Sequence, residues 1–252
     1  MQMRIRLSRW EDGVHKEDST ARLDRWATHE SDSVDLEFVS KDASITLRLQ
    51  QQPHMLARDM GVGSVLWDGA FVLSAYLFEM RKSYQGLRCI ELGSGVGLVG
   101  LLLACMGAQV VMTDRPAVIP VLQGNIRQNC AHCAGTPEAQ SLQWGVPGCL
   151  EQAAALTRQQ PFGLIVASDC IYIDQVGQAP STQHFLELCA VLCSKHTRAL
   201  ITFEARSDEL RQAFVDGASA TGFQVCRLDH QDRLPVMLQV DYIELYELRL
   251  IR

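Results

Sequence analysis

Residues 88–97, RCIELGSGVG, carry the strongest structural signal in this 252-residue chain. The first half is an apolar run of strand length, and the second half places Gly93, Gly95 and Gly97 within five residues. Glycine lets the backbone turn sharply and approach a ligand, and the helix-like segment that follows presents free N–H groups at its N-terminus. This order of elements predicts a site for a nucleotide-like ligand, because three glycines in five residues exceed what closing a turn requires.

Short apolar runs alternate with helical patterns on the C-terminal side of this turn. Further strands are predicted at QVVMT (109–113), SLQW (141–144), GLIVAS (163–168), ALITF (199–203), QVCRL (224–228) and DYIELYELRL (241–250). Helices are predicted near 97–107, 116–130, 181–194 and 207–221. The last two strands have no helix between them and must be antiparallel. The fold class is therefore α/β, with a seven-strand Rossmann-like sheet that is mostly parallel and has an antiparallel last strand.

The N-terminal part of the chain has a different character. Residues 1–30 are charged and show little periodicity, which predicts a flexible N-terminal arm or a flap over the substrate. VDLEFV at 34–39 and SITLRLQ at 44–50 alternate around a short polar turn and predict an N-terminal β-hairpin. Apolar residues three and four apart in 66–80 predict an amphipathic helix. We expect residues 31–252 to form a single domain, a usual size for one α/β core.

Charge and hydropathy exclude some classes of function. The formal net charge of −6 argues against binding of nucleic acid through a broad basic surface. No apolar stretch approaches the length of about 18 residues that spans a bilayer, and the N-terminus has no apolar signal-peptide core, so we expect no membrane association. These features predict a cytoplasmic protein, with the nucleus as a second location.

The nine cysteines are scattered, and most lie in apolar runs where a reduced thiol acts as a small hydrophobe. Cys130, His132 and Cys133 contain one CxxC spacing that could begin a metal site. No second pair follows at a suitable spacing, so we expect no bound metal.

A carboxylate follows the second strand of the predicted sheet. Asp114 ends the segment QVVMTD, where it can accept both ribose hydroxyls of a bound adenosine. Gly95, Gly97 and Gly100 also fit the GxGxxG pattern of dinucleotide sites, so these residues leave a nicotinamide cofactor open. Glu91 suits the amino group of a methionine moiety, and no separate catalytic domain follows, which favours S-adenosylmethionine.

A second polar group follows the strand GLIVA, in the segment SDCIY at 168–172. Ligands of open α/β sheets bind beyond the carboxyl ends of the strands, so Asp169 and Tyr172 should face the same crevice as the glycine turn. A lysine nucleophile, with an ordinary pKa of about 10.4, must lose its proton, which calls for an apolar, aromatic slot and one acceptor. We therefore predict Asp169 and Tyr172 as catalytic residues, the alternative being that Asp169 only caps a helix.

Two tryptophans flank the predicted site. Trp67 stands at the start of the helix in 66–80, and Trp144 follows the weak strand SLQW. Either indole could simply fill the core. Their positions beside strand ends favour contact with the cofactor, and Trp67 and Tyr172 would supply walls for a lysine slot.

Five segments of the chain are LWDGAFVLSAYL, ELGSGVGLVGLLLACMGAQVVMTD, VLQGNIRQN, LQWG and the DxxY of DCIY. They resemble the methyltransferase-like protein 21 family of protein-lysine methyltransferases, and the resemblance as a whole covers roughly residues 45–206. Within this family, TLRLQQ, GVGSVLWDGA and the Glu-x-Arg at 204–206 are most similar to the methyltransferases that act on valosin-containing protein.

The resemblance implies the fold of S-adenosylmethionine-dependent methyltransferases and a cofactor site of matching residues. The implied cofactor contacts are Trp67, Gly93, Ser94, Gly95, Asp114, Trp144 and Ser168. Asp169 and Tyr172 would form the lysine entrance. Val96 replaces the threonine usual in the glycine turn and Ser168 replaces the usual alanine, but neither change removes a charge.

The sequence thus predicts an S-adenosylmethionine-dependent protein-lysine N-methyltransferase acting on a non-histone protein. Valosin-containing protein, or another ATPase or chaperone, is the expected partner, and we expect a monomer. Three alternatives remain: another methyl acceptor such as arginine, histidine or a small molecule, a nicotinamide-dependent oxidoreductase, and a non-catalytic binding module.

Overall fold

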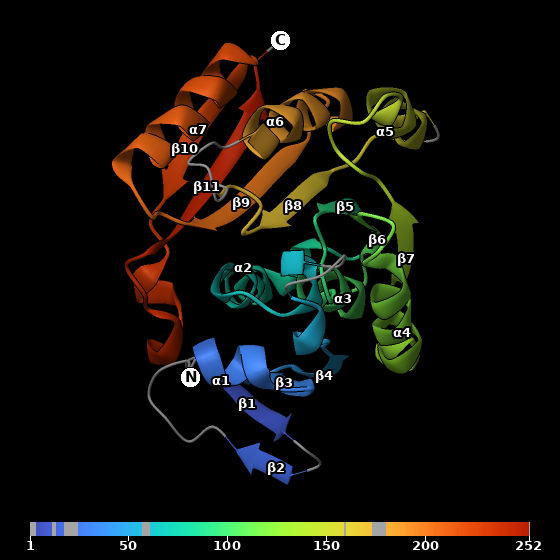
Figure 1. The fold of residues 1–252 in the computed structure, drawn as a ribbon, viewed down its shortest axis with the longest axis vertical. Coiled ribbons are helices and arrows are strands. Elements are labelled where there is room, and N and C mark those ends of the chain that lie inside the picture. The colour runs from blue at the N-terminus through green and yellow to red at the C-terminus, as the bar shows by residue number, and fades with distance from the viewer. Residues whose placement is uncertain are drawn as a thin grey trace.

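Two sheets organise the chain in a computed structural model that describes residues 4–11, 14–17, 25–56, 61–158, 160–172 and 180–251 (Figure 1). The larger sheet has seven strands in the order β10-β11-β9-β8-β5-β6-β7. Their bounds are β5 Arg88–Leu92, β6 Gln109–Asp114, β7 Thr136–Ser141, β8 Leu164–Ser168, β9 Arg198–Glu204, β10 Phe223–Leu228 and β11 Ile243–Leu250. The five strands β5 to β9 pair in parallel, whereas β11 is antiparallel to both β9 and β10. The predicted fold class is confirmed.

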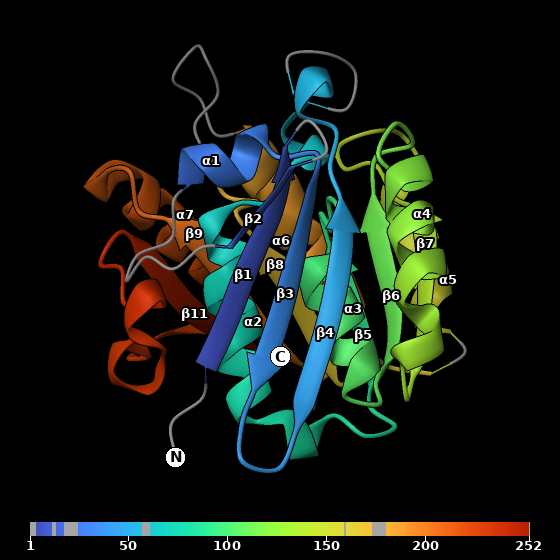
Figure 2. The same ribbon diagram turned by 90° about the horizontal axis from the view of Figure 1, so that it is seen from below.

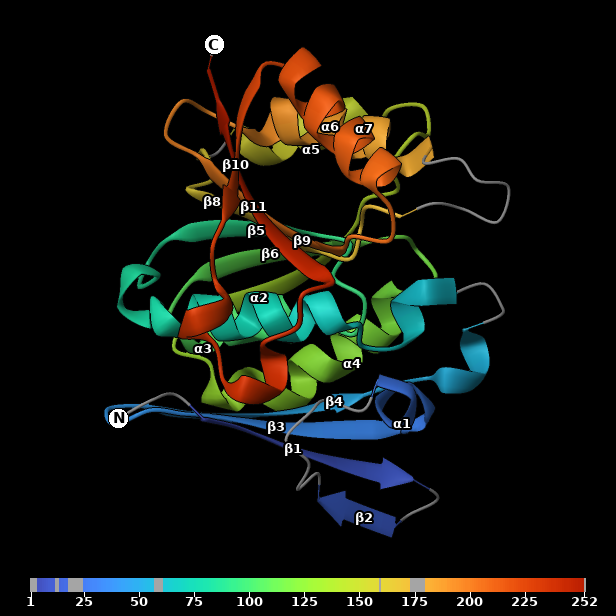
Figure 3. The ribbon, with the colours of Figure 1, turned by 90° about the vertical axis from the view of Figure 1, so that its left-hand side faces the viewer.

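Helices cover both faces of this sheet (Figure 3). One face carries α5 Cys149–Thr157, α6 Pro180–Leu192 and α7 Asp208–Ala220, and the other carries α2 Asp68–Glu79, α3 Leu98–Cys105 and α4 Ile119–Asn129. Each face has its own apolar core. Within the described ranges, no helix is both long and apolar enough to cross a lipid bilayer.

The predicted helix at 66–80 is present as α2, but its predicted amphipathic character is wrong. Every residue from Asp68 to Phe78 is buried. The helix lies between the seven-strand sheet and the N-terminal sheet, so no side of it faces water (Figure 3).

The predicted hairpin forms β3 Ser33–Val39 and β4 Ser44–Gln50, which pair in antiparallel register from Ser33↔Gln50 to Val39↔Ser44. Residues 1–30 were expected to be a flexible arm, but their described part contains β1 Arg4–Glu11, β2 Val14–Glu17 and a short helix α1 Arg25–Glu30. Figure 2 shows the resulting sheet, β2-β1-β3-β4, in front of α2 and α3. The alternation in β1 was missed because Arg9, in register with Val34 on the inward face, interrupts the apolar pattern.

Helix α4 fixes the N-terminal sheet to the rest of the fold. The amide of Asn125 accepts from the backbone N–H of Gln50 at 2.8 Å and donates to its carbonyl at 3.0 Å. Asn129 makes the same pair of bonds to the backbone of Arg48, at 3.0 and 2.7 Å. The two side chains thus satisfy the free edge of β4 as a neighbouring strand would.

Candidate functional site

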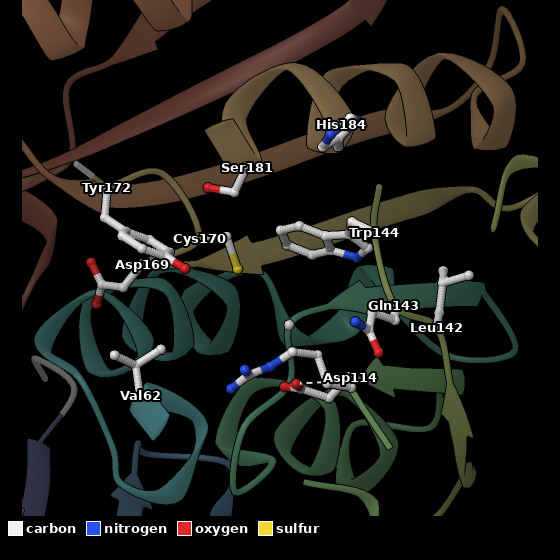
Figure 4. A pocket seen from close by; sticks show the side chains of 12 residues that line it. Val62, Asp114, Leu142, Gln143, Trp144, Asp169, Cys170, Tyr172, Ser181 and His184 are labelled. Carbon is white, nitrogen blue, oxygen red and sulfur yellow. Dashed lines mark hydrogen bonds between the residues drawn. The ribbon is translucent and has the colours of Figure 1, made fainter. Parts of the chain in front are cut away.

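A cavity lies at the carboxyl ends of β5, β6 and β8 (Figure 4). The chain leaves β5 towards β6 and β7 on one side and returns to β8 on the other, which makes this edge the topological switch point of the sheet. The lining residues are Val62, Gly93, Asp114, Arg115, Leu142, Gln143, Trp144, Asp169, Cys170, Tyr172, Ser181 and His184.

A smaller cavity adjoins the first and shares Val62 with it. Its walls include the other predicted site residues, namely Trp67, Glu91, Ser94, Gly95 and Ser168. All ten residues predicted from the sequence therefore line one of two neighbouring cavities, five in each. The structure places them together, while their chemical roles stay predictions.

Backbone conformation requires glycine at two positions of the turn, and a close contact adds to this requirement at one of them. Gly93 and Gly95 have φ angles of +70° and +53°, a region that residues with a Cβ rarely adopt. A Cβ on Gly93 would also lie 2.5 Å from the Sγ of Cys170. The backbone of the turn at Gly93 therefore lines the cavity, where a ligand can contact it.

Asp114 fixes this turn while keeping room for a ligand. Its Oδ2 accepts from the backbone N–H of Gly95 at 2.7 Å, and its Oδ1 accepts from that of Arg115 at 2.7 Å. Each carboxylate oxygen has a second lone pair, so a pair of ligand hydroxyls can still be bound. Burial raises the pKa of Asp114, although these two backbone bonds oppose the shift.

Glu91 is the most deeply buried acid of the site, with 1% of its surface exposed. Its carboxyl accepts from the backbone N–H of Gly100 at 3.0 Å. Burial raises its pKa to about 8, and no ion pair with a basic side chain involves it in the described part of the chain. A cationic ligand group beside Glu91 would supply the missing compensation.

Asp169 has a strained backbone and a tightly held carboxylate. Its φ angle of +52° is the only positive value among the described residues other than glycine. Its Oδ2 accepts from the backbone N–H of Gly69 at 2.7 Å, and its Oδ1 from that of Glu204 at 3.2 Å. The alternative that this carboxylate caps a helix is therefore correct in part, because Gly69 stands in the first turn of α2.

The surroundings of Asp169 are acidic. Burial, helped by the nearby carboxyls of Asp68 and Glu204, raises the pKa of Asp169 to about 7. The hydroxyl of Tyr242 donates to Asp68 at 2.8 Å, and Arg206 pairs with Glu204 at 3.0 Å. A carboxyl with a pKa near neutrality can exchange a proton more readily than an ordinary aspartate.

The aromatic residues stand at different walls. Tyr172, 37% exposed, lies beside Asp169, across the cavity from Leu142 and Gln143 (Figure 4). Trp144 packs against Phe185 of α6, with ring centroids 5.5 Å apart. Trp144 is therefore both packed against the core and part of the cavity wall, whereas Trp67 lines the smaller cavity.

Several lining residues were not predicted. Gln143 stands beside Trp144 and offers an amide that can both donate and accept, and its position after a strand could have been noticed. Ser181 and His184 come from α6, where no sequence signal distinguishes them. The third strand was also misplaced, since β7 covers Thr136–Ser141 and Trp144 follows it. This edge strand lacks an apolar run, so the apolar pattern of the sequence indicated a strand several residues too late.

The CxxC segment gathers no metal ligands. The Sγ of Cys133 lies 3.5 Å from that of Cys105 at the end of α3. Across the residues with described positions, no group of three His, Cys, Asp or Glu side chains is placed to hold a metal ion.

Comparisons with known proteins identify the family of this chain. A protein-family model described as "Lysine methyltransferase" matches residues 42–219. The chain is 33% identical to Protein N-lysine methyltransferase METTL21A of Mus musculus over 59% of its length, and 26% identical to EEF1A lysine methyltransferase 3 of Xenopus tropicalis over 60%. The matches span 64% and 61% of those relatives. The resemblance to the methyltransferase-like protein 21 family is confirmed, while the finer likeness to the methyltransferases of valosin-containing protein stays a prediction.

A solved structure shares the fold. It is the 16S rRNA N2 G1207 methyltransferase RsmC of T. thermophilus in complex with AdoMet and guanosine, with a TM-score of 0.56 and 18% identity. The match covers 87% of this chain and 51% of that one. At this identity the similarity is one of fold alone.

Proposed function

Since this chain belongs to the lysine methyltransferase family, we propose that it is an S-adenosylmethionine-dependent N-methyltransferase that modifies a lysine of another, non-histone protein. One observation supports this most: Gly93 of the glycine turn, Asp114 and Trp144 share a single cavity with Asp169 and Tyr172. A cofactor on the first group of residues and an amine on the second would therefore meet.

The buried acids fit this cofactor. S-adenosylmethionine, when bound, supplies an electrophilic methyl group on a sulfonium centre and also carries an ammonium group. Glu91 would compensate the ammonium charge, which gives a reason for burying a carboxyl among apolar walls. Asp114 would accept the ribose hydroxyls with the lone pairs that Gly95 and Arg115 leave free.

The remaining walls would hold the adenosine and exclude water. Trp144 and Leu142 provide apolar surface, and Gln143 provides an amide next to them. Trp67, with its indole N–H donating to the carbonyl of Val62 at 2.7 Å, closes the smaller cavity.

Asp169 and Tyr172 would receive the lysine. An ammonium must become a neutral amine before it can attack, and a half-exposed aromatic wall lowers its pKa by removing water. Asp169 can accept a hydrogen bond from the amine and so orient its lone pair towards the cofactor. Its raised pKa makes it a better proton acceptor than an ordinary carboxylate.

The proposed targets rest on the resemblance of the sequence and on the name of one relative. We propose valosin-containing protein, or another ATPase or chaperone, as the substrate. EEF1A is a further candidate, because one relative is named for it. We propose a monomer in the cytoplasm, with the nucleus as a second location.

The cofactor is tested first by calorimetric titration with S-adenosylhomocysteine, with NAD and NADH as controls. We expect micromolar binding of S-adenosylhomocysteine and none of either nicotinamide. Nicotinamide binding instead would overturn the proposal.

The acceptor is tested next with a tritiated methyl donor, purified valosin-containing protein and EEF1A, and whole lysate. Mass spectrometry should place the label on a lysine, and replacing that lysine by arginine in the target should abolish labelling. Label on arginine, histidine or a small molecule would overturn the lysine assignment while leaving the cofactor assignment intact.

A further inference from the structure

Three aromatic rings connect the surface of helix α1 with the smaller cavity. The ring of Trp26 is 71% exposed and lies 6.1 Å from that of His29. The ring of His29 is buried and lies edge-on at 4.5 Å from that of Trp67, with an interplanar angle of 64°. Trp67 in turn lines the cavity that holds Glu91. Helix α1 precedes the region 42–219 that the family model matches.

A buried glutamine ties the end of α1 to the same wall. The side-chain amide of Gln51 donates to the carbonyls of Thr28 and Ser31 at 2.7 and 2.8 Å. Its oxygen accepts from the backbone N–H of Leu66, the residue before Trp67, at 2.6 Å. Gln51 is 5% exposed, so these bonds are shielded from water. The position of α1 relative to Trp67 is therefore fixed from two directions.

We propose that His29 is a positioning residue for cofactor binding, because its ring holds the indole of Trp67 in the orientation that completes the smaller cavity. This inference rests on the proposed function, since it assumes that this cavity receives part of S-adenosylmethionine. It adds to that function a contribution from the N-terminal segment.

The physical basis is the conformational freedom of one indole. Trp67 is anchored through its N–H to Val62, and the contact with His29 restricts rotation of the ring about that anchor. The energy of an edge-on aromatic pair of this kind corresponds to roughly a two- to tenfold change in the equilibrium between the orientations of the ring. If the competent orientation loses that much population, the apparent Kd of the cofactor rises by the same factor. At saturating cofactor the ring is held by the ligand, so kcat should change little.

The test compares His29→Ala with His29→Phe, which keeps a ring at the position. We expect His29→Ala to raise the calorimetric Kd of S-adenosylhomocysteine two- to tenfold and His29→Phe to restore it to within twofold. With a labelled target, KM for the methyl donor should rise similarly while kcat stays within twofold. His196→Ala, an exposed histidine that lines neither cavity, is the matched control and should behave as wild type.

A second readout follows the ring itself. In protein labelled with 5-fluorotryptophan, the ¹⁹F resonance of Trp67, assigned with Trp67→Phe, should shift or broaden in His29→Ala and return in His29→Phe. An unchanged Kd together with an unchanged resonance would overturn the inference, as would a His29→Phe protein no better than His29→Ala. If wild-type protein does not bind S-adenosylhomocysteine, the proposed function fails instead, so the two failures are distinguishable.

Discussion

The Oδ2 of Asp169 accepts a hydrogen bond of 2.7 Å from the backbone N–H of Gly69, 100 residues earlier in the chain. This bond joins the tip of β8 to the first turn of α2, and so it connects the proposed lysine entrance to the helix that starts beside Trp67. The same carboxylate would thus serve both the fold and the reaction, and a variant at this position has to separate the two.

Asp169→Asn separates them best. Asparagine tolerates the positive φ of this position and keeps an oxygen that can accept from Gly69, but it carries no charge. We expect methyl transfer to be lost, with S-adenosylhomocysteine affinity within a few fold of wild type. The loss of Tm should be smaller than in Asp169→Ala, because only the hydrogen bond from the N–H of Glu204 is lost. Asp169→Ala should also lose transfer and, in addition, about 1–2 kcal/mol of stability. A fully active Asn or Ala variant would show that the carboxylate only caps the helix.

Gly69→Ala moves the carboxylate without changing its chemistry. A Cβ at this position would lie 2.5 Å from the Oδ2 of Asp169, so the acid must shift by a sizeable fraction of an ångström. Since misplacement of a catalytic group is costly, we expect kcat to fall roughly 10- to 100-fold while cofactor affinity changes little. Gly124→Ala, on α4 with no neighbour closer than 4.0 Å, is the control. Equal activity of both variants would contradict the proposed role of Asp169.

Asp114→Ala should act on the cofactor rather than on the lysine. The substitution removes the acceptor for Gly95 and, in the proposed function, that for the ribose hydroxyls. We expect S-adenosylhomocysteine binding to weaken by about 1–3 kcal/mol, as measured by calorimetry. An unchanged affinity would place the ribose elsewhere in the cavity.

The architecture was predictable where periodicity is strong and was missed where neighbours determine the structure. Buried parallel strands read as continuous apolar runs, which is why β5, β6, β8 and β9 were located from the sequence. The edge strand β7 has only partly buried or exposed residues and was placed too late. The alternation in β1 is interrupted by Arg9, so the position of β1 beside the hairpin is determined by its pairing with β3.

The site was predictable to the extent that topology alone determines it. Residues that end parallel strands must gather at one edge, so the sequence alone predicts that Gly93, Asp114 and Asp169 lie together. The contacts of Trp67 with His29, and of Asp169 with Gly69, depend on packing between distant segments. A single sequence does not encode such contacts in any local pattern.

The stability of the ligand-free protein should fall as the pH rises from about 4.5 to 8. Glu91 has a folded-state pKa of about 8 against an ordinary value of 4.5, and Asp169 has one of about 7 against 3.8. Between these values the folded state keeps protons that the unfolded state has released, so raising the pH favours unfolding. Below about pH 4 this loss of stability is absent because both acids are protonated in the folded and the unfolded state. Above about pH 8 the loss is fully present.

Glu91→Gln removes one of the two groups and should flatten this slope. Glu187→Gln changes a partly exposed acid on α6, whose pKa is lowered by a hydrogen bond from Gln183, and should leave the slope in place. Chemical denaturation at several pH values measures the effect.

In the proposed function S-adenosylhomocysteine brings an ammonium group to Glu91 and stabilises its ionised form, so binding should release a proton near neutral pH. Calorimetry in buffers of different ionisation enthalpy detects that proton. Its absence in wild-type protein, with binding intact, would mean that the ammonium pairs with another acid than Glu91.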